Sequence, residues 1–208
     1  MKEVLIKKVP QGTIMPEILK QVMDLQVQNH YSSKQKAEIK KEGAGIFLFN
    51  LKELEEISNQ GLMSVALIKE DGIFTQKVVG YAMAVPTNMV IKNSFFNKTF
   101  EERCKKFYQE KGLEGDLLIT DCFLSKNERV ARNSEDFVGN KLIQSLSESI
   151  RENYKKAQVF CPIEAISKNY RFYFRKYKLT FGMNPKLIYV NDSECRVVYI
   201  GHKELEAV

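Results

Sequence analysis

The sequence of 208 residues has few of the residues that build metal centres or hydrolytic triads. It contains no tryptophan, four cysteines and only two histidines, His30 and His202. No Cys-x-x-Cys pair occurs and the histidines do not cluster, so neither a zinc site nor a disulfide framework is indicated. A Ser-His-Asp or Cys-His hydrolase would depend on one of these two histidines, which argues against that class. Cys122 and Cys161 fall within apolar strand patterns and are expected to be buried structural thiols.

Long hydrophobic runs are also missing. No apolar stretch approaches the roughly 20 residues of a membrane span, and residues 1–12 lack the apolar region and cleavage site of a signal peptide. We therefore expect a cytoplasmic protein with no membrane partner. No repeat and no Pro/Gly/Ser-rich linker divides the chain, so one domain over residues 1–208 is predicted.

The chain does carry an excess of positive charge, with a formal net charge of +6 and a pI near 9.0. This charge suggests an anionic partner, which would be a phosphorylated cofactor, an acidic substrate or a nucleic acid. Many lysines alternate with acidic residues, as in "QKAEIKKEG", and such mixed runs are typical of solvated helix faces. Nucleic-acid binding is therefore not favoured, and it would show as strongly salt-dependent association.

Hydrophobic periodicity predicts strands and helices that interleave in the centre of the chain, with hairpins on either side. The expected fold is α/β (α+β), with a mixed, mostly antiparallel central sheet flanked by helices. The predicted elements are a strand at 3–9, helices from about 15 and at 51–59, a hairpin at 64–86, an aromatic helix at 94–112, a strand at 117–124, a helix from about 137 to 154, a strand at 158–162, a helical piece at 168–178 and a hairpin at 186–200.

Several phrases, taken in this order, resemble the GNAT superfamily of acetyl-coenzyme A-dependent N-acyltransferases over nearly the whole chain. They are a Leu-Gln-x-x-Asn helix with a following Glu-Gly, then "VVGYAMAV", "TDCFLSKNER" and "SKNYRFYFRKYKLTF". The resemblance implies a V-shaped cleft between the central strands. It also implies that the main chain of Cys122, Phe123 and Leu124 pairs with the pantetheine arm of the acyl donor. Core packing alone would explain the same residue types equally well.

The loop after this strand departs from the family pattern. The resemblance aligns Arg129 with the family's arginine and Gly139 with its last glycine, but "VARNSEDF" between them is longer than expected and has no glycine. Glycines there permit close approach to the pyrophosphate, whereas Glu135 and Asp136 would repel it. A helix start stabilised by its own capping residues is the alternative. The residues expected to bind the cofactor in this region are Arg129, Arg132, Gly139, Asn140, Lys141 and, at the start of the last helix, Asn169.

The resemblance also suggests catalytic groups. Asp121 matches an acidic position at the end of the central strand, where a carboxylate can accept the proton of an amine nucleophile. Glu164 is an alternative base. The alternative role for Asp121 is a hydrogen bond at the end of the strand. The family tyrosine that protonates the coenzyme A thiolate is replaced by Lys176, with Tyr173 and Tyr177 nearby. A phenol, with a pKa of about 10, suits that role.

The sequence therefore predicts an N-acetyltransferase that moves an acyl group from acetyl-CoA to a small-molecule or peptide amine by direct attack. The alternative is a degenerate GNAT-fold binding or regulatory module without catalysis, which the loss of loop glycines favours. No residue identifies the acceptor amine, and the resemblance leaves a homodimer open.

Overall fold

The computed structural model describes the main parts of two compact units. The described residues are 3–9, 15–30, 33, 35, 37, 47–70, 73–86, 89, 109, 116–125, 138–154, 157–164, 186–189 and 195–200. Unit 1 comprises Met1–Asn29, Leu48–Ala84 and Cys122–Asn153, and unit 2 comprises His30–Phe47, Val85–Asp121 and Tyr154–Val208. A single domain over the whole chain stays a prediction.

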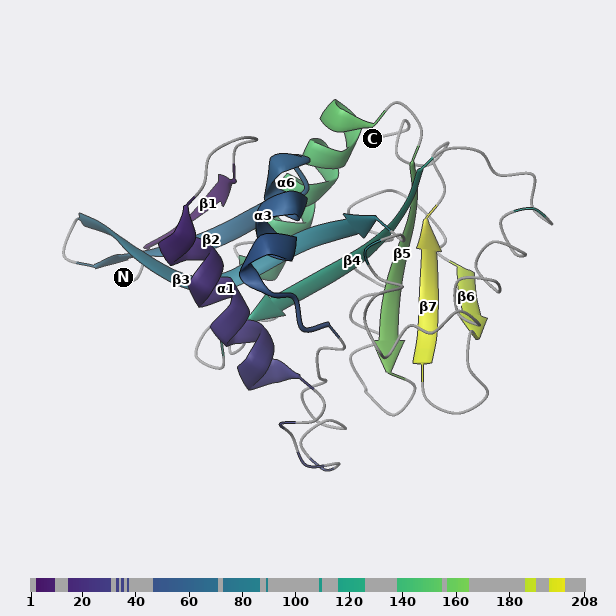
Figure 1. Ribbon diagram of the computed structural model, residues 1–208, viewed down its shortest axis with the longest axis horizontal. Helices are drawn as coiled ribbons and strands as arrows, with labels where there is room; N and C mark the ends of the chain where they lie inside the picture. The colour runs from purple at the N-terminus through teal and green to yellow at the C-terminus, as the bar shows by residue number, and fades with distance from the viewer. Residues whose placement is uncertain are drawn as a thin grey trace. The chain divides into compact units, whose positions relative to one another are not determined.

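The sheet of unit 1 is built on an antiparallel hairpin. Strands β2 (Met63–Glu70) and β3 (Ile73–Pro86) pair from Met63↔Met83 to Glu70↔Ile73, which confirms the hairpin predicted at 64–86. Strand β1 (Glu3–Lys8) pairs antiparallel with β2, and the end of β4 (Asp116–Leu124) follows β3 in the strand order β1-β2-β3-β4 (Figure 1). The predicted opening and central strands are therefore confirmed.

Three helices of unit 1 follow the apolar periodicity of the sequence. Helix α1 (Pro16–Asn29) buries Ile18, Leu19, Val22 and Leu25, and α3 (Leu51–Asn59) buries Leu54 and Ile57 against it. Helix α6 (Val138–Asn153), predicted from about 137 to 154, buries an apolar stripe from Val138 to Ile150. None of the described helices is both long and apolar enough to cross a membrane.

Side-chain size differs between the two faces of this sheet. The register pairs Ser64 with Ala82 and Ala66 with Gly80, so these small residues share one face, while Val65 and Tyr81 face the other way. Helix α6 contacts β1 and β2, and the Ser64 hydroxyl lies 2.9 Å from that of Ser145 on α6. The small residues thus let α6 lie close to the sheet, and α1 and α3 cover the opposite face (Figure 1).

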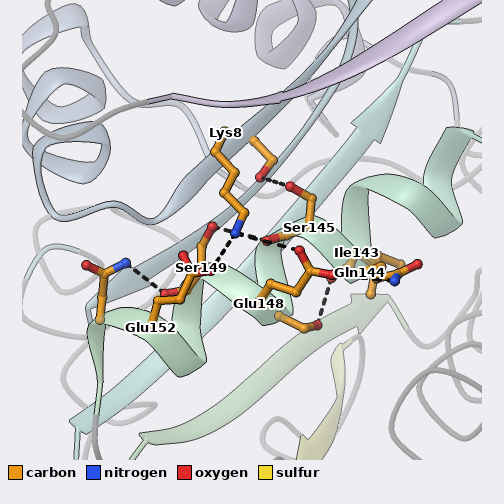
Figure 2. A network of polar contacts seen from close by, with 10 residues as sticks. Lys8, Ile143, Gln144, Ser145, Glu148, Ser149 and Glu152 are labelled. Carbon is orange, nitrogen blue, oxygen red and sulfur yellow. Dashed lines mark hydrogen bonds and ion pairs between the residues drawn. The ribbon is translucent and has the colours of Figure 1, made fainter. Parts of the chain in front are cut away.

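A polar contact network fixes the rotation of α6 about its axis (Figure 2). Lys8 is the register partner of Ser64 and therefore points to the same face. Its Nζ lies 2.8 Å from a carboxylate oxygen of Glu152 and 3.6 Å from one of Glu148. Because these groups are solvent-exposed, the ion pairs contribute at most about 1 kcal/mol, and their main effect is to orient the helix.

Helix α3 begins with a capping box at Asn50. The Asn50 side chain accepts a hydrogen bond from the Glu53 N–H at 3.0 Å, and the Glu53 carboxylate accepts one from the Asn50 N–H at 2.9 Å. The helix ends at Asn59 and is followed by Gly61, whose φ of +71° suits glycine. Both ends lie where the sequence predicted them.

Replacing Asn50 with alanine is expected to lower the free energy of unfolding by about 0.5–2 kcal/mol, because the N–H of Glu53 loses its acceptor. Urea denaturation of the variant measures this loss. Lys52→Ala, an exposed change within the same helix, serves as the control and should stay within about 0.5 kcal/mol of the parent. Equal stability of the two variants would show that the cap contributes nothing.

Unit 2 contains the start of β4 and three further strands in the order β4-β5-β7-β6. Strand β5 (Ala157–Glu164) runs parallel to β4 from Asp116↔Ala157 to Ile119↔Phe160. Strand β7 (Cys195–Ile200) pairs antiparallel with β5 and with β6 (Lys186–Tyr189), which confirms the closing hairpin. The sheet is mixed and mostly antiparallel, as predicted. The aromatic helix at 94–112 and the helical piece at 168–178 lie outside the described residues, apart from Gln109.

Candidate functional site

The candidate site centres on the second half of β4, where this strand leaves its parallel neighbour. In the described parts of β4 and β5, no register pair follows Ile119 and Phe160, although β4 continues to Leu124. Main-chain groups of β4 beyond Ile119 are therefore not used in the ladder with β5. The V-shaped cleft between the central strands stays a prediction.

Two polar side chains, Thr120 and Asp121, come directly after the end of this ladder. Only 5% of the Thr120 surface and 7% of the Asp121 surface are exposed. A buried carboxylate has to be stabilised by polar contacts, and Asp121 does make such interactions. Alternation along the strand directs the Asp121 and Phe123 side chains to one face and those of Cys122 and Leu124 to the other. Asp121 is thus a buried carboxylate that has interaction partners, and its role as a general base stays a prediction.

Cys122 is half-buried and forms no disulfide, so the prediction that it is buried was wrong, while its structural role stays a prediction. The apolar pattern suggested full burial, but Cys122 and Phe123 lie near the end of the strand, and both are partly exposed. Leu124 is buried, with 7% of its surface exposed. The Cys161 side chain lies outside the described residues.

Strand β3 holds the end of β4 closely. The N–H of Ser125 donates to the Val79 carbonyl at 2.7 Å, and the Phe123 and Tyr81 rings are 6.3 Å apart with a tilted geometry. Between Val79 and Tyr81, Gly80 lies against Leu124 and the Phe123 carbonyl. The sequence singled out this segment only as the phrase "VVGYAMAV". A glycine inside a strand marks a close backbone approach, and this signal was overlooked.

The first turn of α6 contains three predicted cofactor-binding residues. Gly139 is buried, Asn140 is half-buried and Lys141 is exposed. The Asn140 Oδ1 atom is buried and accepts no hydrogen bond from the part of the chain that the structure describes. N–H groups of a first helical turn, together with a nearby cation, are suited to binding an anion. Leu142, which follows, is fully buried and anchors this turn.

The remaining predicted site residues cannot be placed. Main-chain atoms of Glu164 end β5 and pair with Cys195, while its side chain is not described. Among the described residues, no group of three or more His, Cys, Asp or Glu could hold a metal ion. Residues outside the described part are Arg129, Arg132, Glu135, Asp136, Asn169, Tyr173, Lys176 and Tyr177.

Comparison with known proteins identifies the fold. Neither a family model nor a curated protein sequence matches the chain. The chain is similar in structure to a ribosomal-protein-alanine N-acetyltransferase from Brucella melitensis, with a TM-score of 0.51 and 15% identity over 95% of this chain and 99% of that one. It is also similar to the aminoglycoside acetyltransferase AAC(6')-Ib in complex with coenzyme A, with a TM-score of 0.51 and 15% identity over 98% of both chains. The predicted fold is therefore confirmed along nearly the whole chain.

Proposed function

We propose that this chain, whose fold is that of the GNAT N-acyltransferases, is an acetyl-CoA-dependent N-acetyltransferase. One observation above all supports the proposal. In a fold shared with two N-acetyltransferases, a carboxylate that is only 7% exposed, Asp121, stands two residues beyond the last parallel pair of the central strands. A carboxylate held in this way can accept the proton that an amine must lose before it attacks.

Acyl-donor binding would use main-chain and cationic groups. The coenzyme's pantetheine arm would pair with the main chain of Cys122, Phe123 and Leu124, beyond the end of the ladder with β5. Its diphosphate would bind the N–H groups of the first turn of α6, where buried Gly139 allows close approach. Further contacts would come from Arg129, Arg132, Asn140, Lys141 and Asn169. The coenzyme A in the similar AAC(6')-Ib complex supports such a donor.

The reaction requires two proton transfers around one acyl transfer. Asp121 would take a proton from the acceptor's ammonium group, directly or through water. The free amine would then attack the thioester carbonyl, whose oxygen would accept a hydrogen bond from a main-chain N–H near Phe123. A C–N bond forms, the C–S bond breaks, and Tyr173 or Tyr177 would protonate the departing thiolate. Positioning and stabilisation of the oxyanion would supply most of the rate enhancement.

The acceptor would be a small-molecule or peptide amine. The two similar enzymes are named for a ribosomal-protein alanine and for aminoglycosides, which are acceptors of these two kinds. Both kinds therefore belong in a screen for activity.

Acetyl-CoA is expected to raise the melting temperature of the protein. A ligand at 100 times its Kd stabilises the native state by about 2.7 kcal/mol, which corresponds to about 5–10 °C for a chain of this size. Differential scanning fluorimetry with an external dye measures the shift, and ATP, which has phosphates but no pantetheine arm, is the control ligand. The proposal is wrong if millimolar acetyl-CoA leaves the melting temperature unchanged.

The second candidate is a GNAT-fold binding or regulatory module without catalysis. It is favoured by the absence of glycine from "VARNSEDF", the segment before α6. Release of the free thiol of coenzyme A in the presence of an amine panel distinguishes the two. Amine-dependent thiol release supports the enzyme, whereas a folded protein that releases no thiol with any amine of the panel supports the module.

A further inference from the structure

Gly80 occupies the point of closest approach between β3 and the end of β4. A Cβ atom at this position would lie 2.5 Å from Leu124 Cδ2, 3.0 Å from the Phe123 carbonyl oxygen and 3.2 Å from Leu142 Cδ1. Carbon atoms in contact are normally separated by about 3.5–4.0 Å. The contact therefore has no room for any side chain, even a methyl group.

The three neighbours differ in how easily they can move. Leu124 Cδ2 is the end of a flexible side chain, and a change of rotamer can withdraw it. The Phe123 carbonyl belongs to the main chain of β4. This main chain is tied to β3, because the Ser125 N–H donates a hydrogen bond to the Val79 carbonyl at 2.7 Å. Leu142 belongs to the buried face of α6. A side chain at position 80 would therefore push the β4 main chain or the helix.

The direction of this push matters for the proposed chemistry. Phe123 C=O and Ser125 N–H both face β3, so alternation along the strand directs the main-chain groups of Cys122 and Leu124 to the opposite edge. Displacing Phe123 away from β3 would move this edge toward the place proposed for the pantetheine arm.

We infer that Gly80 is a positioning residue for the acyl donor: by carrying no side chain, it holds the main chain of residues 122–124 against β3 and so sets where the opposite edge of the strand meets the pantetheine arm. The inference rests on the proposed function and deepens it. Gly80 itself need not touch the coenzyme, and its effect is transmitted through the Phe123 carbonyl. It would govern affinity for the pantetheine half of coenzyme A rather than for the nucleotide half.

The test measures calorimetric binding of two probes, coenzyme A and adenosine 3′,5′-bisphosphate, which is the nucleotide half without the pantetheine arm. Gly80→Ala is expected to raise the Kd of coenzyme A about tenfold, because a displacement of a fraction of an ångström disrupts aligned hydrogen bonds. Gly80→Val is expected to raise it further. The Kd of adenosine 3′,5′-bisphosphate should not change in the alanine variant.

Gly61→Ala provides a matched control for loss of stability. Gly61 has a φ of +71°, and a Cβ there would lie 2.7 Å from Asn153 Nδ2, so this variant is also strained, but at the end of α3. It should lower the melting temperature without changing the Kd of coenzyme A.

The outcomes separate the inference from the function on which it rests. If the parent protein binds neither probe, the proposed function fails. If the parent protein binds coenzyme A but folded Gly80→Ala binds it equally well, the positioning role is wrong and the proposed function stands. The positioning role is also overturned if Gly80→Ala raises the Kd of both probes equally. The same holds if Gly61→Ala raises the Kd of coenzyme A as much as Gly80→Ala does, since either result would indicate general destabilisation.

Discussion

Replacing Asp121 with asparagine is expected to lower kcat about 10²–10⁴-fold while acetyl-CoA binds with nearly unchanged affinity. The carboxylate, only 7% exposed, lies beyond the end of the ladder between β4 and β5, and asparagine keeps its shape but cannot accept the amine proton. Thiol release, measured with the best acceptor in the amine panel, gives kcat, and calorimetry gives the affinity for acetyl-CoA.

The pH dependence separates proton transfer from structural support. In the parent protein, kcat/KM should fall at low pH as the general base becomes protonated, and in Asp121→Asn this acidic limb should be lost. Asp116→Asn, at the start of the same strand, is the control and should keep both rate and profile. A folded Asp121→Asn variant with parental kcat would remove Asp121 from the proposed mechanism and leave Glu164 as the candidate base.

The second large effect is expected from Leu142→Ala in α6. This side chain is fully buried and directly follows the helical turn that would bind the diphosphate. Truncation to alanine removes three heavy atoms, Cγ, Cδ1 and Cδ2, and leaves a cavity against β3, which costs about 2–5 kcal/mol. For a chain of this size the melting temperature should fall by about 5–20 °C.

Gln144→Ala is the matched control on the exposed face of the same helix. It removes only an exposed contact to Glu148 at 3.4 Å and should change stability by less than about 0.5 kcal/mol. Scanning calorimetry of both variants tests the expectation. Comparable melting temperatures would mean that α6 is not packed against the sheet through Leu142.

Much of the fold could be predicted from the sequence because it depends on local periodicity. Alternation predicted β1 and the β2–β3 hairpin, and the helical spacing from Val138 to Ile150 predicted the buried stripe of α6. Register is a different property, because it depends on which strands meet and at which residues. The face shared by Lys8, Ser64 and Gly80 therefore emerged only from the structure.

The candidate site was less predictable for the same reason. Asp121 was identified because a family resemblance aligns it, and its burial agrees with an organised site. Cys122 was misjudged, since an apolar pattern cannot indicate that a strand leaves its neighbour after Ile119. The importance of Gly80 lies in distances to Leu124 and Phe123, which are far away in sequence. A fold can persist at 15% identity because it requires patterns of residue size and polarity rather than particular residues.

The row of small residues beneath α6 also limits how this protein can diverge. Ser64, Ala66, Gly80 and Ala82 leave room for the helix, so a larger residue at any one of them requires a smaller partner across the contact. Substitutions in the sheet and in α6 should therefore appear in compensating pairs among descendants of this sequence. Exposed positions of α6, such as Gln144, are under less constraint on size.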